Sequence, residues 1–173
     1  MSDPRYPIGE FELPGSLELE ERTEAIGQIG RVPSDLRAAV ADLAPEQLDT
    51  PYRSGGWTVR QVVHHLPDSH LNGYTRFKLA LTEDVPTIRP YEEERWAELP
   101  DANGPVEPSL QLLDALHSRW VYLLERVDDA TWERRLQHPE VGELGMEDLL
   151  ALYAWHGRHH VAHITALREL QGW

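Results

Sequence analysis

Apolar residues recur at intervals of three and four along most of the chain, the spacing that places them on one face of an α-helix. The pattern predicts helices over residues 17–30, 58–81, 91–99, 108–127 and 146–170. No stretch alternates apolar and polar residues long enough to form a central sheet. Four of the segments are long and amphipathic, so we expect an all-α fold built as a four-helix bundle.

Prolines and polar caps predict where these helices begin and bend. Pro33 is placed at a helix start, which predicts a break between the first helix and a short continuation after it. Thr58 and Gln61 have the spacing of a capping box, in which each residue satisfies a free backbone donor of the other. Pro67 falls inside the helix that follows and removes one backbone donor, which predicts a kink or bulge near His65.

The segment between the second and third long helices is rich in proline and predicts a long connection with a short helix at 91–99. Such a connection permits a crossover between helices instead of a simple up-and-down order. Residues 45–48 predict a turn, and residues 137–145 predict a loop or a small hairpin. With no internal repeat or composition break, we expect one domain over residues 1–173.

Charge and composition exclude several classes of partner. Thirty acidic and sixteen basic side chains give a formal charge of −14, which disfavours nucleic acid and anionic membranes. Residues 1–15 lack the apolar core of a signal peptide and no apolar run reaches spanning length, so we expect a cytoplasmic protein. The chain has no cysteine, so histidines and carboxylates must hold any metal.

Four of the nine histidines lie within eight residues of the last predicted helix, at 156, 159, 160 and 163. At about 100° per residue, His156, His160 and His163 replace apolar residues in the core-facing stripe, and His159 lies at its edge. Buried imidazoles need a hydrogen-bond partner or a metal. Either i, i+4 pair could bind one ion, but only His156 and His160 lie wholly near the centre of the stripe. The alternative is a set of core histidines with polar partners, or a polar seam at a subunit contact.

The helix predicted over residues 58–81 offers a third ligand, but periodicity leaves its identity open. His70 lies on the apolar stripe of this helix. His65 lies on a polar stripe with Asp68, Ser69 and Arg76. That stripe faces either solvent or a wet pocket whose deepest member is His65.

The sequence Gly-Gly-Trp-Thr-Val-Arg-Gln-Val-Val-His-His-Leu over residues 55–66 carries a family resemblance, together with Asp-Ser-His at 68–70. Further matching segments follow in order over residues 6–10, 76–79, 88–91 and 155–165. The chain thereby resembles, over nearly its whole length, the YfiT-like branch of the DinB superfamily. The resemblance implies a four-helix bundle, commonly dimeric, so we expect a homodimer.

The same resemblance implies one divalent metal per chain held by three histidines, which map onto His65, His156 and His160. Zinc and nickel are the metals that we expect. The match departs at Pro67, where relatives more often carry a helix-compatible residue.

Three imidazoles leave an open coordination position, which is typical of a catalytic metal and not of a structural one. The resemblance implies either a metal-dependent hydrolase or a transferase that joins a low-molecular-weight thiol, such as bacillithiol, to an electrophile. We favour the transferase because no protein base is evident and a metal can itself activate a thiol. A metal-binding stress protein without turnover is the third alternative. Arg60, Arg76 and Arg158 are candidates for binding an anionic thiol, although each also fits an ordinary surface residue.

Overall fold

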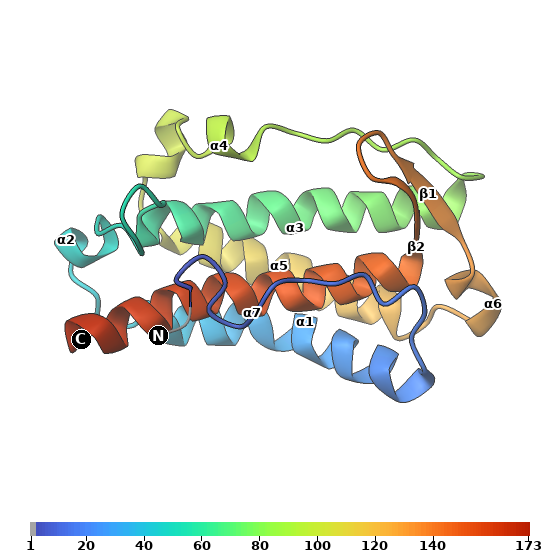
Figure 1. Ribbon diagram of the computed structural model, residues 1–173, viewed down its shortest axis with the longest axis horizontal. Helices are drawn as coiled ribbons and strands as arrows, with labels where there is room; N and C mark the ends of the chain where they lie inside the picture. The colour runs from blue at the N-terminus through green and yellow to red at the C-terminus, as the bar shows by residue number, and fades with distance from the viewer. Residues whose placement is uncertain (1–2) are drawn as a thin grey trace.

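Four long helices lie side by side as a bundle (Figure 1), which confirms the predicted all-α fold. The computed structural model describes residues 3–173, so Met1 and Ser2 of the expected single domain lie outside the described residues. The long helices are α1 (Leu19–Ala39), α3 (Val59–Thr82), α5 (Glu107–Leu124) and α7 (Met146–Gln171). None of the helices within residues 3–173 combines the length and the apolar composition needed to cross a bilayer.

The helices are not arranged in simple up-and-down order. Helix α1 packs against α5 and α7, and α3 packs against the same two helices, so α1 and α3 are diagonal. Arg22 near the start of α1 pairs with Glu147 at the start of α7, and Arg168 near the end of α7 donates to the carbonyl of Ala39. Helices α1 and α7 are therefore parallel, and α3 and α5 form the other parallel pair (Figure 1).

A parallel neighbour requires a connection that returns along the bundle, and residues 83–106 supply the predicted crossover (Figure 1). The expected helix over 91–99 is shorter in the structure, where α4 (Glu93–Trp96) is followed by the 3-10 turn η1 (Pro100–Asn103). The side chain of Gln61 ties the crossover to α3 by donating to the carbonyl of Ala97 at 2.8 Å.

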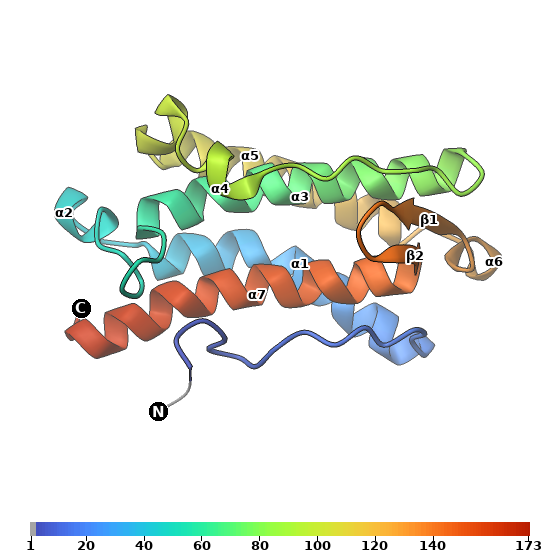
Figure 2. The ribbon, with the colours of Figure 1, turned by 45° about the horizontal axis from the view of Figure 1, so that its top comes forward.

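The remaining elements close the two ends of the bundle. Helix α2 (Pro45–Leu48) forms where the sequence predicts a turn, and α6 (Asp129–Trp132) follows α5. Strands β1 (Arg135–His138) and β2 (Gly142–Gly145) pair in antiparallel register, so the predicted loop or hairpin is a hairpin. The N-terminal segment runs along α7 (Figure 2), held by hydrogen bonds such as Gly15 N–H to Asp148.

The predicted break at Pro33 is wrong, since α1 continues through it to Ala39. Helix α3 likewise continues through Pro67 without interruption, so the expected bulge is absent from this stretch of the described chain. A proline inside a helix costs about 3 kcal/mol. Val32, Leu36 and Leu66 beside these prolines are fully buried, and burying each contributes roughly 1.5–3 kcal/mol. Packing of the neighbouring side chains therefore outweighs the local cost.

The core consists of two apolar clusters separated by a layer of histidines. One cluster surrounds Trp120 and Phe77, and the other surrounds Leu66 and Leu113. On α5, His117 lies between Leu113 of one cluster and Trp120 of the other. The histidines of α3 and α7 occupy the same level, so the polar layer crosses the middle of the bundle.

Candidate metal centre

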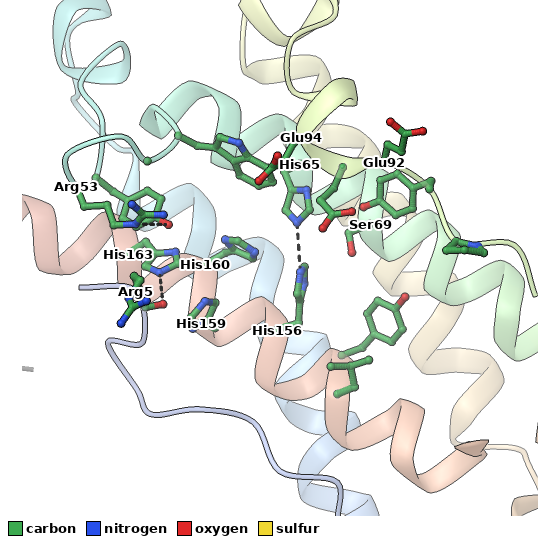
Figure 3. Close-up of a pocket in the computed structure, with 18 of the residues that line it drawn as sticks. Arg5, Arg53, His65, Ser69, Glu92, Glu94, His156, His159, His160 and His163 are labelled. Atoms are coloured by element: carbon green, nitrogen blue, oxygen red, sulfur yellow. Dashed lines mark hydrogen bonds between the residues drawn. The ribbon is translucent and has the colours of Figure 1, made fainter. Parts of the chain in front are cut away.

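The structure brings His65 of α3 together with His156 and His160 of α7 (Figure 3). One ring nitrogen from each residue lies within 4.8 Å of the other two. The Nε2 atoms of His65 and His156 are 3.2 Å apart. The predicted triad is therefore a spatial cluster, formed by one helix and the i, i+4 pair of its antiparallel neighbour.

The start of α3 fixes the position of His65. The hydroxyl of Thr58 accepts from the Gln61 backbone, and the Gln61 side chain accepts from the Thr58 backbone, as the capping box predicts. The Trp57 ring lies 4.6 Å from the His65 ring and 6.2 Å from the His160 ring, measured between centroids. His65 is only 8% exposed, so its polar stripe lines a pocket instead of facing bulk solvent.

Helix α7 is held close to its neighbours by the absence of a side chain at Gly157. A Cβ atom at Gly157 would lie 2.4 Å from Cγ2 of Val32 in α1. Gly73 of α3 similarly leaves room for the ring of Tyr153, which a Cβ atom there would meet at 2.4 Å. These two contacts seat α7 against α1 and α3 on either side of His156.

Burial keeps the three imidazoles neutral at ordinary pH. It lowers the pKa of His65 to about 4. Burial also lowers the pKa values of His156 and His160 well below the usual value, and the neighbouring histidines lower them further. A neutral imidazole keeps one nitrogen lone pair, which is the form that binds a metal.

The three residues fit a divalent transition metal. Two nitrogens bound to one tetrahedral ion at 2.0–2.1 Å are about 3.3 Å apart, close to the separation of the His65 and His156 Nε2 atoms. The Nδ1 atom of His160 is buried and has no hydrogen-bond partner among residues 3–173. Three converging neutral nitrogens with no carboxylate in the cluster match the ligand preference of zinc, nickel and similar ions.

The other pair on α7, His159 and His163, faces the N-terminal segment. The Nε2 atom of His163 donates to the carbonyl of Arg5 at 3.2 Å, and its ring stacks on Tyr52 at 4.0 Å. The ring of His159 stacks on Trp155. Neither residue belongs to the cluster of converging nitrogens.

A cavity of about 720 Å³ opens over the triad. Arg5 and Arg53 lie at one side of it, whereas Glu92 and Glu94 of the crossover lie at the other (Figure 3). Arg53 and Arg76 line the cavity without a carboxylate in ion-pair distance anywhere in residues 3–173. Each of these two guanidinium groups can therefore bind an anion that enters the cavity.

Of the arginines considered from sequence, only Arg76 lines this cavity. Arg60 pairs with Asp49 at 2.7 Å, and Arg158 lines a separate groove. Sequence reasoning missed Arg53 because it lies in the loop before the helix cap, and no periodic pattern applies to a loop. Its position two residues before the Gly-Gly-Trp motif is the one signal that could have indicated it.

Comparison with known proteins identifies the family of this chain. The profile described as the DinB superfamily matches residues 28–164. The chain belongs to the DinB superfamily. Relatives from Bacillus mycoides (strain KBAB4) and Bacillus cereus (strain B4264), both provisionally named metal-dependent hydrolases, are 56% and 55% identical. Both alignments cover 100% of each chain.

Solved structures support the same assignment. YfiT from Bacillus subtilis, provisionally described as a metal-dependent hydrolase with an unusual four-helix bundle topology, superposes with a TM-score of 0.96. It is 48% identical, and the match covers 98% of both chains. The four-helix bundle protein TT2238 superposes with a TM-score of 0.57 at 23% identity over 88% of this chain and 99% of its own, and this likeness concerns the fold alone. The chain is thus a YfiT-like DinB protein with a histidine cluster suited to a divalent metal.

Proposed function

We propose that this protein is a metal-dependent transferase that joins a small, carboxylate-bearing thiol to an electrophilic small molecule. His65, His156 and His160 would hold the metal, with zinc and nickel as the expected ions. The observation that carries the proposal is that Arg53 and Arg76 line the cavity above these histidines and that neither has a carboxylate in ion-pair distance among residues 3–173. A guanidinium without an acidic partner is a strong donor for a carboxylate.

A divalent metal held there would lower the pKa of a thiol bound at its open position, so that the sulfur is nucleophilic at neutral pH. Arg53 and Arg76 would bind the carboxylates of the thiol and orient its sulfur, and Trp57 would cover one side of the histidines. The sulfur then bonds to the electrophilic carbon, the leaving group departs with its electron pair, and the thiol proton passes to solvent.

Two further observations support a reaction between two small molecules. The chain has no cysteine, so the nucleophilic sulfur must arrive with the cosubstrate. The cavity of about 720 Å³ lies in the range of ligand sites and is large enough for a thiol beside a small electrophile.

Hydrolysis is the second candidate, and it has support of its own. The Bacillus relatives carry the provisional name of metal-dependent hydrolase. Asp68 lines a narrow space beside His65, and burial raises the pKa of its carboxyl to about 6. A carboxylate with such a pKa is suited to accept a proton from an attacking water near neutral pH.

The test compares both reactions on one preparation. The protein is stripped with a chelator, reloaded with zinc or nickel, and assayed with an alkyl halide plus thiol and with an ester without thiol. We expect conjugation that disappears on chelation and returns with metal. Metal-dependent ester hydrolysis that a thiol only inhibits would establish the hydrolase instead. Stoichiometric metal binding with neither activity would favour the non-catalytic stress protein.

The proposed binding of the thiol carboxylate by Arg53 is tested separately, with Arg158 as a matched control. Substituting Arg53→Met should raise KM about tenfold for a thiol that carries carboxylates, because a hydrogen bond to a charged group is lost. KM for uncharged 2-mercaptoethanol should not change. Arg158→Met removes an arginine outside the cavity and should alter neither value. Equal effects of Arg53→Met on both thiols would contradict the proposed role.

A further inference from the structure

A series of buried hydrogen bonds leads from His156 through the interior of the bundle to the carbonyl of Ile29 in α1. The Nδ1 atom of His156 lies 3.1 Å from Nε2 of His70, whose Nδ1 lies 2.8 Å from Nε2 of His117. The Nδ1 atom of His117 lies 2.6 Å from the carbonyl oxygen of Ile29. The four residues come from α7, α3, α5 and α1, so the chain crosses all four long helices.

The two middle histidines are inaccessible to solvent, with exposures of 0% for His70 and 1% for His117. Their rings lie in nearly parallel planes, 13° apart, and the ring of Trp120 packs nearly perpendicular to both. Burial lowers the pKa values of both residues, that of His117 to about 4. Each ring is therefore neutral near pH 7 and carries a single N–H group.

The last acceptor in this series of hydrogen bonds, the carbonyl of Ile29, is available because of a proline. The carbonyl of Ile29 would normally accept from the backbone N–H of residue 33, four positions later in α1. Residue 33 is proline, which has no N–H. The Ile29 carbonyl is consequently left without its helical donor, and His117 approaches it from α5.

A carbonyl oxygen only accepts, and this sets the direction of every bond in the chain. His117 must donate from Nδ1, so its Nε2 accepts from His70 Nδ1. His70 Nε2 then accepts from His156 Nδ1. The proton of His156 is thereby on Nδ1, and its Nε2, which faces His65, carries the free lone pair.

We propose that His70 and His117 are positioning residues that fix the tautomer and ring orientation of His156 so that its Nε2 is ready to bind metal. The role rests on the metal centre under Proposed function. Partners behind a metal ligand typically contribute 10- to 100-fold in metal affinity. Neither residue touches the cavity, so neither is a catalytic residue.

The first test needs neither metal nor substrate. Long-range ¹H–¹⁵N NMR of the metal-free protein, labelled in its histidines, shows which nitrogen of each ring bears the proton. We expect Nδ1–H in His117, His70 and His156, although free imidazole side chains in water prefer Nε2–H. A proton on Nε2 of metal-free His156 would overturn the proposal without any variant.

The second test is a zinc titration of His117→Phe by competition with a chelating dye. Without His117, His70 can donate to His156 from Nε2, which places the proton of His156 on the nitrogen that faces the metal. Zinc affinity should fall 10- to 100-fold, and the NMR pattern of His156 should shift toward Nε2–H. His117→Gln, whose amide can both accept and donate, should restore most of the affinity.

The control is Trp120→Phe, which alters packing against both middle histidines but removes no hydrogen bond of the chain. It should change zinc affinity less than threefold. Equal losses in the His117 and Trp120 variants would assign His117 to packing alone and overturn the proposal. If the protein lacks conjugating activity, the proposed reaction is wrong, but the NMR pattern and the zinc affinities still test the positioning role. If the unmodified protein fails to bind zinc, both the metal centre and the positioning role are wrong.

Discussion

Gly157 offers a direct test of how packing supports the metal centre. It lies in α7 between His156 and His160, and a Cβ atom there would meet Cγ2 of Val32 at 2.4 Å and Cγ1 at 3.1 Å. Real Cβ atoms do not approach other carbons this closely, so Gly157→Ala must push α7 away from α1 or force Val32 from its rotamer. We expect both the stability of the bundle and the alignment of the two histidines to suffer.

The magnitude follows from two opposing effects. Overpacking by one methyl group costs about 1–3 kcal/mol, and Ala is better than Gly in a helix by about 1 kcal/mol. The net loss in the free energy of unfolding should be about 0–2 kcal/mol, and toward the upper end because the contact with Cγ2 of Val32 is as short as 2.4 Å. Adding Val32→Ala removes both Cγ atoms and leaves Cβ of residue 32 as the nearest contact, at 3.3 Å. The double variant should therefore bind zinc better than Gly157→Ala alone.

The assay is urea unfolding of the metal-free protein together with zinc titration. Gly30→Ala in α1 is the control, because its Cβ would meet Val121 at an ordinary 3.5 Å. That variant should be neutral or more stable by up to about 1 kcal/mol. A Gly157→Ala protein with unchanged stability and zinc affinity would refute the close-packing explanation, as would a Val32→Ala substitution that restores no zinc binding.

Three further outcomes are expected. The free energy of unfolding of the metal-free protein should fall as pH drops from 6.5 toward 4, by about 1.4 kcal/mol per pH unit for each of His65 and His117, whose pKa values burial lowers to about 4. In urea titrations at several pH values, His117→Phe should reduce this slope by about 1.4 kcal/mol per pH unit, and an unchanged slope would contradict a buried, neutral His117. His160→Ala should abolish stoichiometric zinc in elemental analysis while His159→Ala retains it; the reverse result would reassign the ligand pair. Chelation should lower Tm, since zinc at 1,000 times its Kd adds about 4 kcal/mol, and a Tm unaffected by chelator would contradict a resident metal.

Helix positions were predictable because each long helix carries its own apolar stripe, and the capping box at Thr58 marks one helix start. The parallel pairing of α3 with α5 was open from sequence, since a long connection permits a crossover but does not require one. The interruption expected at Pro33 was wrong because a local rule omits the burial of Val32 and Leu36, which tertiary packing supplies.

Only part of the candidate site could be predicted from the sequence. Helical geometry selected His156 and His160 on α7. It did not decide whether His65 faces solvent or a pocket, and the family resemblance then favoured the pocket. The crossover and the N-terminal segment build that pocket, and neither follows a periodic pattern. Arg53 enters the cavity from the loop between α2 and α3, which also lacks a periodic pattern, so spacing alone does not encode its position.

Proline in this bundle has two physical effects, of which sequence rules register one. The rule treats Pro33 as a residue that interrupts a helix, because its nitrogen cannot donate. The same missing donor leaves the carbonyl of Ile29 free inside the core, where an unpaired acceptor costs about 1–3 kcal/mol. His117 removes that cost by donating to it at 2.6 Å. The proline therefore creates the fixed acceptor that gives the histidine hydrogen bonds their direction, and through His117 and His70 it determines which nitrogen of His156 carries the lone pair.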